Sequence, residues 1–143
     1  MTALEAAYKS LKVLVVDDQE IVRRTICGLL ELLGIVSIAQ AEDGASGYME
    51  VLRVRPDVVL CDIHMKPIDG QAFLARVRAS EADWVRELLV IVLSGDNMLD
   101  TIRIASQHHA DAYMMKPILL DDLKKQLDIA ITRQAERASR KGP

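Results

Sequence analysis

The fold of this chain is decided by one short stretch, Pro56-Asp57-Val58-Val59-Leu60-Cys61-Asp62. Its apolar residues follow one another without polar residues between them, which is typical of a strand buried between helices on both faces of a parallel sheet. The run ends in a carboxylate, Asp62, at the C-terminal tip of the strand. Open α/β sheets bind their ligands outside the carboxyl ends of the strands, so we expect Asp62 to face a functional site.

Strands of this kind alternate with amphipathic helices along the rest of the chain. Apolar runs predict strands at residues 12–16, 35–39, 56–62, 88–93 and 111–115. Apolar residues at helical spacing predict helices that include residues 22–33, 45–52, 70–77, 98–105 and 120–131. Strands that alternate with helices pair in parallel through right-handed crossovers, so the sequence predicts a three-layer α/β domain with a five-stranded sheet.

Length and composition suit a single globular domain, because the chain has 143 residues, half of them hydrophobic and 27% charged. The pattern gives an N-terminal extension at residues 1–10, the domain itself at 11–132 and a basic polar tail at 133–143. The tail contains Arg137, Arg140 and Lys141, and we expect it to fray or to act as a short linker.

The overall charge gives no general reason to expect nucleic acid or an anionic membrane as a partner, because the formal net charge is -3. The N-terminus has no signal-peptide pattern, and the longest apolar run, Leu88–Leu93, is too short to span a bilayer. We therefore expect a cytoplasmic protein. The two cysteines, Cys27 and Cys61, are predicted to be core residues rather than a disulfide or a metal pair.

Three carboxylates would meet at one edge of the sheet if the strand that ends at Asp17 and Asp18 lies beside the strand that ends at Asp62. Two unit charges ~4 Å apart repel by roughly 4 kcal/mol at an effective dielectric constant near 20, so the group needs compensation. Lys116, at the end of the fifth predicted strand, supplies one positive charge against three negative ones and leaves -2. A hard divalent cation balances this charge, and Mg²⁺, or Mn²⁺ in its place, suits carboxylate and phosphate oxygens.

A carboxylate beside a metal ion and a lysine can attack phosphorus and form an aspartyl phosphate. The cation and the ammonium group would neutralise the charge of the transferred group. Ser94, at the end of the fourth predicted strand, would hydrogen-bond a phosphoryl oxygen. Any one of these residues alone would be interpreted as a turn or helix-cap residue, but together at the strand ends of one sheet they favour phosphoryl chemistry.

The order and spacing of these residues resemble the receiver domain of two-component response regulators, in particular stand-alone regulators of the chemotaxis type. The resemblance covers residues 11–132. The matching segments are Val15–Asp18, Asp62–Gly70, Val92–Gly95 and Ala112–Pro117. The resemblance implies a flavodoxin-like, doubly wound, five-stranded parallel sheet in the order 2-1-3-4-5, the order of a chemotaxis member of this family.

By this resemblance, Asp62 accepts a phosphoryl group from a histidine kinase or a histidine phosphotransfer protein. The implied ligands of Mg²⁺ or Mn²⁺ are Asp17, Asp18, Asp62 and the main-chain carbonyl of His64. Lys116 is expected to pair with the phosphoryl group, and the peptide bond between Lys116 and Pro117 is expected to be cis. The domain would catalyse its own phosphorylation and dephosphorylation and is not otherwise expected to be an enzyme.

Ser94 and Tyr113 match the two switch residues of the family, a hydroxyl group that moves toward the phosphoryl group and an aromatic ring that turns inward. This movement is expected to reshape the surface formed by the helix at 98–105, the strand at 111–115 and the helix at 120–131. A downstream protein, or a second copy in a homodimer, would bind there. His64 and Asp96, each two residues beyond a motif residue, occupy positions that tune phosphoryl lifetime in the family.

Two functions of other classes remain open. A phosphatase of the haloacid dehalogenase type also uses a strand-end aspartate and magnesium, but it needs a second acidic residue two positions later, where this chain has His64. A flavodoxin-like electron carrier needs a phosphate-cradling loop after the first strand, where Asp17-Asp18-Gln19-Glu20 would repel the phosphate group. Both alternatives fit the sequence less well than a receiver domain.

Overall fold

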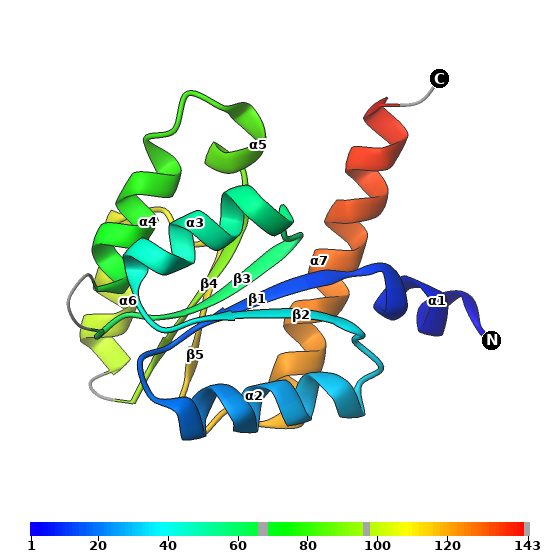
Figure 1. Ribbon diagram of the computed structural model, residues 1–143, viewed down its shortest axis with the longest axis horizontal. Coiled ribbons are helices and arrows are strands. Elements are labelled where there is room, and N and C mark those ends of the chain that lie inside the picture. Colours follow the sequence, from blue (N-terminus) through cyan, green and yellow to red (C-terminus); the bar gives the residue numbers. More distant parts are fainter. Residues whose placement is uncertain (66–68, 96–97, 142–143) are drawn as a thin grey trace.

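The computed structural model describes residues 1–65, 69–95 and 98–141. A single parallel sheet lies at its centre, with helices on both sides (Figure 1). The sheet has five strands in the order β2-β1-β3-β4-β5, as predicted. The strands are β1 (Lys12–Val16), β2 (Ser37–Ala41), β3 (Val58–Asp62), β4 (Leu89–Ser94) and β5 (Ala112–Met115).

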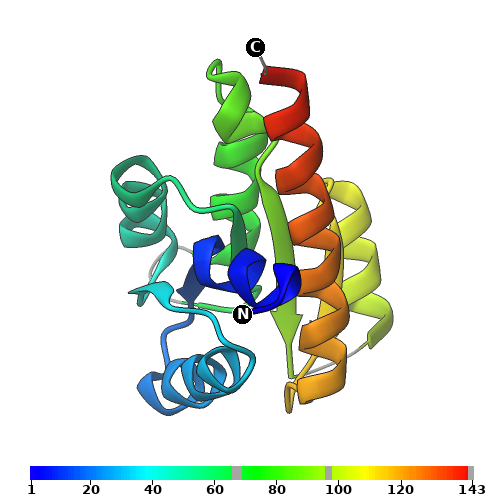
Figure 2. The same ribbon diagram turned by 90° about the vertical axis from the view of Figure 1, so that its right-hand side faces the viewer.

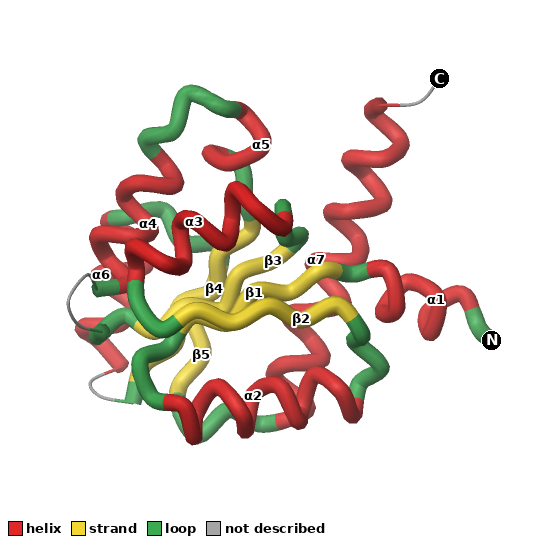
Figure 3. Tube along the Cα trace, in the orientation of Figure 1, coloured by secondary structure: helices red, strands yellow, loops and turns green. Residues whose placement is uncertain are grey.

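The helices divide between the two faces of the sheet, as Figure 3 shows with strands in yellow and helices in red. One face is covered by α1 (Ala3–Ser10), α2 (Glu20–Leu32) and α7 (Leu120–Lys141). The other face is covered by α3 (Gly44–Val54), α4 (Gly70–Arg78), α5 (Asp83–Arg86) and α6 (Met98–Gln107). The predicted three-layer, doubly wound α/β fold is therefore confirmed.

The strands at the centre of the sheet are apolar at nearly every position because both of their faces are buried. In β1, Val13 and Val15 belong to the core beneath α2 and α7. Leu14 and Val16, which alternate with them, belong to the core beneath α3 and α4. Every residue of β3 and β4 is buried.

The second strand begins two residues later than predicted, because Ile35 belongs to the end of α2. Gly34, with a φ angle of 96°, donates its N–H to Glu31 O, and Ile35 donates its N–H to Leu30 O. These two bonds form a Schellman motif, which closes a helix with a left-handed glycine followed by an apolar contact. Ile35 is buried there, and the strand starts at Ser37.

The C-terminal residues differ from the frayed tail that the sequence suggested, because α7 continues as a helix to Lys141. Contacts with distant parts of the chain accompany this extension. Arg133 Nη1 donates to Asp111 Oδ1 at 2.9 Å, and Arg137 Nη2 donates to the main-chain oxygen of Glu87 at 2.5 Å. Local sequence carries no sign of these long-range partners.

The N-terminal residues are also structured, as a helix that lies beside α7 (Figure 2). Thr2 caps α1 by accepting the N–H of Glu5. Tyr8 is buried and donates its hydroxyl proton to Asp128 Oδ1 of α7 at 2.5 Å. Lys124 Nζ lies 3.0 Å from the other oxygen of Asp128. A three-residue polar contact therefore joins the N-terminus to the last helix.

Both cysteines are buried and free, as predicted. Within the described residues, no helix combines the length and the apolar character needed to cross a membrane.

Candidate functional site

An acidic cluster forms where the two central strands end. β1 and β3 are neighbours with Val16 aligned to Cys61, so Asp17 and Asp62 leave the sheet side by side. One carboxylate oxygen from each of Asp17, Asp18 and Asp62 lies within 4.8 Å of the others. Asp17 and Asp62 are buried, whereas Asp18 is exposed. The cluster is therefore open to solvent on the side of Asp18.

Lys116 follows β5 and places its ammonium group between two of these carboxylates. Its Nζ atom donates a hydrogen bond to Asp17 Oδ2 at 2.9 Å and lies 3.3 Å from Asp62 Oδ2. The peptide bond between Lys116 and Pro117 is cis. Burial lowers the pKa of Lys116, but the hydrogen bond to Asp17 and the charge of Asp62 outweigh burial and raise this pKa above its usual value. Lys116 is therefore a cation at neutral pH.

The Asp62 carboxyl group has one oxygen toward Lys116 and the other toward the main chain. The N–H of His64 donates to Asp62 Oδ1 at 3.3 Å. Burial raises the pKa of Asp62 above its usual value, the charge of Lys116 opposes this effect, and the charge of Asp17 adds to it. A buried carboxylate with few hydrogen bonds is poorly solvated and hence a better nucleophile.

Asp17 is held in place by three hydrogen bonds besides the one from Lys116. Its Oδ1 atom accepts the N–H of Gln19 at 2.9 Å, and its own N–H donates to Ala41 O at 3.1 Å. Arg23, from α2, donates to the main-chain oxygen of Asp17 at 2.7 Å. No pattern in the sequence connects Arg23 with the site, because this contact is made to the main chain.

Gly70, the last residue of the matching segment Asp62–Gly70, has a steric role at the site that the sequence analysis did not assign. It begins α4, and a Cβ atom added there would lie 2.1 Å from the main-chain oxygen of Asp62. Gly70 N also donates to Ile63 O at 2.9 Å. The absence of a side chain therefore lets α4 approach the end of β3. A glycine directly after the capping Asp69 is the only local sign of this role.

The other predicted site residues lie around the cluster at different depths. Ser94 ends β4 and is fully buried, and its main-chain oxygen accepts the N–H of Lys116 at 2.7 Å. His64 is exposed beside Asp62. Tyr113 is 39% exposed on β5. Asp96 lies outside the described residues.

Tyr113 lies in a groove of about 850 Å³ between α6, β5 and α7. Apolar side chains form much of its lining, among them Ile102, Met114 and Leu119. Lys116 also lines this groove, so one residue contacts both the groove and the acidic cluster. The groove and the cluster are therefore adjacent parts of one edge of the molecule.

The donor set of the cluster fits a hard divalent cation. Its three carboxylate oxygens are close enough to share one ion. Three negative charges and the single charge of Lys116 leave -2, which a divalent cation balances. Oxygen ligands of this kind, with solvent access on one side, suit Mg²⁺, which retains several water molecules when bound.

The comparisons with known proteins agree with this geometry. The family model of the response regulator receiver domain matches residues 13–128. The chain belongs to the response regulator receiver family. It therefore contains the receiver domain of a two-component response regulator, and such domains serve phosphorylation-dependent signalling. Membership of this signalling family decides against the phosphatase and the flavodoxin-like electron carrier.

Curated relatives of this receiver domain are longer proteins. It is 36% identical over 110 residues to the gliding motility regulatory protein of Myxococcus xanthus, covering 77% of this chain and 14% of that protein. It is 30% identical over 136 residues to the transcriptional regulatory protein PrrA of Mycobacterium tuberculosis, covering 95% of this chain and 56% of that protein. The chain thus spans only part of each of these relatives.

Solved structures share the fold of this receiver domain almost throughout. A putative response regulator from Chloroflexus aurantiacus has a TM-score of 0.78 at 21% identity, covering 85% of this chain and 98% of that one. The chemotaxis protein CheY4 of Vibrio cholerae has a TM-score of 0.75 at 23% identity, covering 84% of this chain and 98% of that one. At these identities the similarity establishes the fold.

Proposed function

We propose that this receiver domain is a phosphorylation switch in which Asp62 accepts the phosphoryl group. The donor would be a histidine kinase or a histidine phosphotransfer protein, as in other two-component systems. The observation that carries the proposal is the position of Lys116 Nζ, 2.9 Å from Asp17 and 3.3 Å from Asp62, at the edge where three carboxylates meet. This arrangement is negative enough to hold a metal ion and has a cation for the transferred group.

Each residue of the site has a separate task in phosphoryl transfer. An oxygen of Asp62 forms a bond to phosphorus while the bond between phosphorus and the donor nitrogen breaks, and the electron pair returns to the donor imidazole. Lys116 neutralises charge on the transferred group. Ser94, at the end of β4, would donate its hydroxyl proton to a phosphoryl oxygen.

Asp17, Asp18, Asp62 and the main-chain carbonyl of His64 would hold Mg²⁺, or Mn²⁺ in its place. When bound, the ion supplies positive charge for the phosphoryl oxygens. The same residues would later support attack by water on the aspartyl phosphate, so the domain would also end its own signal. The lifetime of the aspartyl phosphate would depend on His64 and Asp96, each two residues beyond a motif residue.

The readout of this switch would be the groove beside Tyr113. Phosphorylation adds about -1.5 to -2 charge at Asp62. Movement of Ser94 toward the phosphoryl group would leave space for the exposed ring of Tyr113 to turn inward. The α6, β5 and α7 surface would then change its affinity for a downstream protein or for a second copy of the domain.

Intact-mass spectrometry after incubation with acetyl phosphate tests the proposal directly. The wild type should gain one phosphoryl group with Mg²⁺ present and none with a chelator. Asp62→Asn should gain none. Asp121→Asn, which changes an exposed carboxylate at the start of α7, is the matched control and should behave as the wild type.

The proposal fails if the wild type gains no phosphoryl group from either acetyl phosphate or a phosphorylated histidine kinase. It also fails if Asp62→Asn is modified as fully as the wild type. A constitutive binding domain with the same fold would then be the better account of the protein.

A further inference from the structure

A second cavity lies at the edge of the sheet opposite the acidic cluster, where the strands begin. Its volume is about 300 Å³. Three regions enclose it: the link between α3 and β3, the short helix α5, and the end of α7. The lining residues that carry the argument are Arg55, Asp57, Trp84, Gln134 and Arg137.

The extension of α7 forms one wall of this cavity and is fixed there by hydrogen bonds. Arg137 Nη2 donates to the main-chain oxygen of Glu87 at 2.5 Å. Gln134 Nε2 donates to Asp57 Oδ2 at 3.3 Å, and the same oxygen accepts the N–H of Lys12 at 2.8 Å. The single carboxylate of the cavity is therefore already engaged by two N–H groups.

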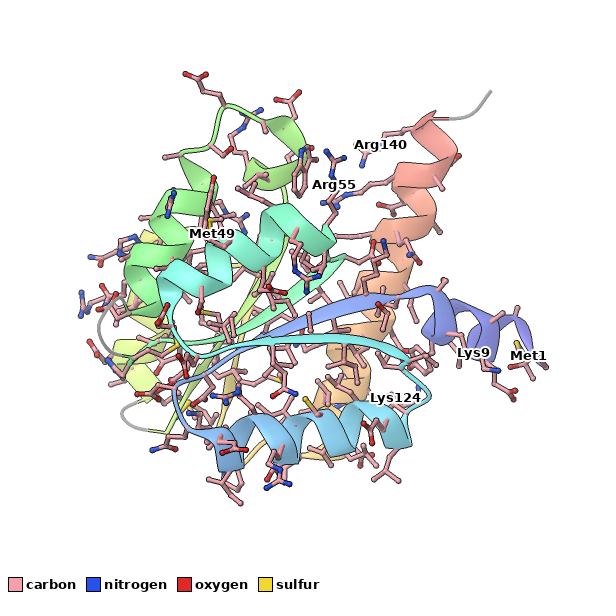
Figure 4. The ribbon with its side chains drawn as sticks, viewed as in Figure 1. Met1, Lys9, Met49, Arg55, Lys124 and Arg140 are labelled. Atoms are coloured by element: carbon pink, nitrogen blue, oxygen red, sulfur yellow. The ribbon has the colours of Figure 1, made fainter. Side chains whose placement is uncertain are left out.

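Arg55 enters the cavity from the C-terminal cap of α3. Its guanidinium carbon lies 4.5 Å from the centroid of the Trp84 ring, a cation–π contact. Within residues 1–65, 69–95 and 98–141, no hydrogen bond or ion pair engages this guanidinium group. Figure 4 shows the side chain of Arg140 extending from α7 toward Arg55. Positive side chains therefore converge where the only lining carboxylate is already engaged.

The chemistry of these groups matches a phosphate ester. Guanidinium groups bind phosphate oxygens through paired hydrogen bonds, and they do so more readily than ammonium groups because their N–H donors are coplanar. Indole and guanidinium faces also stack on planar rings. A cavity of about 300 Å³ is at the small end of the range for small-molecule sites.

We propose that this cavity binds a small phosphate-bearing anion of the size of a mononucleotide. The phosphate group would lie against Arg55 and Arg137, and the planar part would contact Trp84 on the part of its ring that Arg55 leaves open. This site is separate from the acidic cluster and does not depend on phosphorylation of Asp62. Its occupation would add ligand contacts to α3, α5 and α7 together.

The tryptophan supplies a direct readout, because Trp84 is the one tryptophan in the chain. Titration with adenosine monophosphate, excited at the red edge of indole absorption, should change Trp84 emission with saturation. Adenosine, which lacks the phosphate group, should give no saturable change at the same concentrations. Inorganic phosphate should compete with the nucleotide, and added salt should weaken binding.

Variants of the two lining arginines test the residue assignment. Arg55→Gln and Arg137→Gln should each weaken binding at least about tenfold, the loss expected for one charge-assisted pair. Arg24→Gln removes an exposed cation from α2 and should bind as the wild type does. Because Arg137 also contacts the main chain of Glu87, circular dichroism should first show that each variant is folded. Among the described residues, the side chain of Arg55 has no hydrogen bond to the main chain. The affinity of Arg55→Gln for adenosine monophosphate is therefore the deciding measurement.

The proposal is overturned if adenosine monophosphate produces no saturable change in Trp84 emission in the millimolar range. Equal binding by the wild type and Arg55→Gln would overturn it as well. Equal binding of adenosine and its monophosphate would do the same, because the phosphate group would then play no part.

Discussion

At the scale of single residues, the acidic cluster depends on two neighbours that are not acidic. Lys116 reduces the repulsion between Asp17 and Asp62 through contacts of 2.9 and 3.3 Å. Gly70 lets α4 pass the end of β3 without a steric clash. One residue sets the charge of the site and the other sets its shape, so changes at the two positions should have different effects.

Replacement of Lys116 by glutamine should separate metal binding from phosphorylation. The change removes a positive charge from the site, so Mg²⁺ affinity should rise, by up to about tenfold for a unit charge a few ångströms away. Phosphorylation by acetyl phosphate should slow, because no ammonium group remains for the transferred group. Titration calorimetry measures the first effect and intact-mass time courses the second.

Lys9→Gln is the matched control, because Lys9 is an exposed cation on α1. This change should leave both the Mg²⁺ affinity and the rate of phosphorylation unchanged. A Lys116→Gln protein that binds Mg²⁺ more weakly than the wild type would contradict the role given to this charge.

Gly70→Ala should destabilise the fold, because the added Cβ would lie 2.1 Å from the oxygen of Asp62. Main chain must move to relieve this clash, which costs at least about 2 kcal/mol. Gly28→Ala provides the contrast, since a Cβ atom in the middle of α2 meets nothing within 4 Å. That change should stabilise the protein by about 0.5–1 kcal/mol. Urea unfolding measures both, and equal effects would refute the steric argument.

The residues of the site could be predicted to different extents. Asp17, Asp62 and Lys116 follow apolar strands, and the ends of parallel strands meet at one edge, so sequence alone brings them together. Gly70 and Arg23 act on main-chain atoms of Asp62 and Asp17. A contact between a residue and the main chain of another segment has no pattern in the sequence, so the sequence analysis does not assign a role to either residue.

At the scale of elements, strand prediction succeeded where burial alone decides the pattern. β3 and β4 are buried at every position and coincide with apolar runs. The edge strand β2 begins two residues later than the apolar pattern predicts, because the buried side chain of Ile35 packs at the end of α2. α1 has Leu4 and Tyr8 at helical spacing, but its partner Asp128 lies 120 residues further along the chain, so local sequence does not show that α1 docks on α7.

The contact between α1 and α7 should stabilise the protein in a pH-dependent way. The hydrogen bond from Tyr8 holds the pKa of Asp128 below its usual value. A lowered carboxyl pKa contributes stability above the value in the unfolded chain, and this stability is lost as pH falls through the folded value. Tyr8→Phe should therefore lower the free energy of unfolding by about 1 kcal/mol at neutral pH.

The difference between wild type and Tyr8→Phe should shrink in acid, below the usual aspartate pKa of 3.8. Urea unfolding at several pH values measures it. Tyr48→Phe is the control. The guanidinium group of Arg76 lies over the face of the Tyr48 ring, and this contact is kept when the hydroxyl group is removed. A Tyr8→Phe difference that is constant with pH would count against Asp128 as the partner.

At the scale of the whole molecule, one arginine joins segments on both sides of the sheet. Arg78 of α4 donates to the main-chain oxygens of Arg86, Leu88 and His109 and to Asp111 Oδ2. Asp111 in turn accepts the N–H of Val90 and a guanidinium proton of Arg133. This network links α4, β4 and the extended part of α7 around the start of β5.

Arg78→Met should therefore destabilise the molecule as a whole. It leaves three carbonyls without this donor and removes one of the three donors of Asp111, at a cost of about 2–4 kcal/mol. The side chain of Arg53, 68% exposed and paired with Glu50, offers a matched control, and Arg53→Met should stay within about 0.5 kcal/mol of the wild type. Chemical unfolding would contradict the argument if the two variants were equally stable.

Because both cysteines are buried, neither native thiol is accessible at the protein surface. Cys61 has no exposed surface, and burial raises its pKa well above the usual value, while burial also raises the pKa of Cys27. Maleimides and similar reagents attack accessible thiolates. Leu119, 60% exposed beside Tyr113 in the groove, could thus be changed to cysteine and carry a spin label or a dye with both native cysteines retained. Rearrangement of that surface would then be visible spectroscopically in an otherwise unaltered chain.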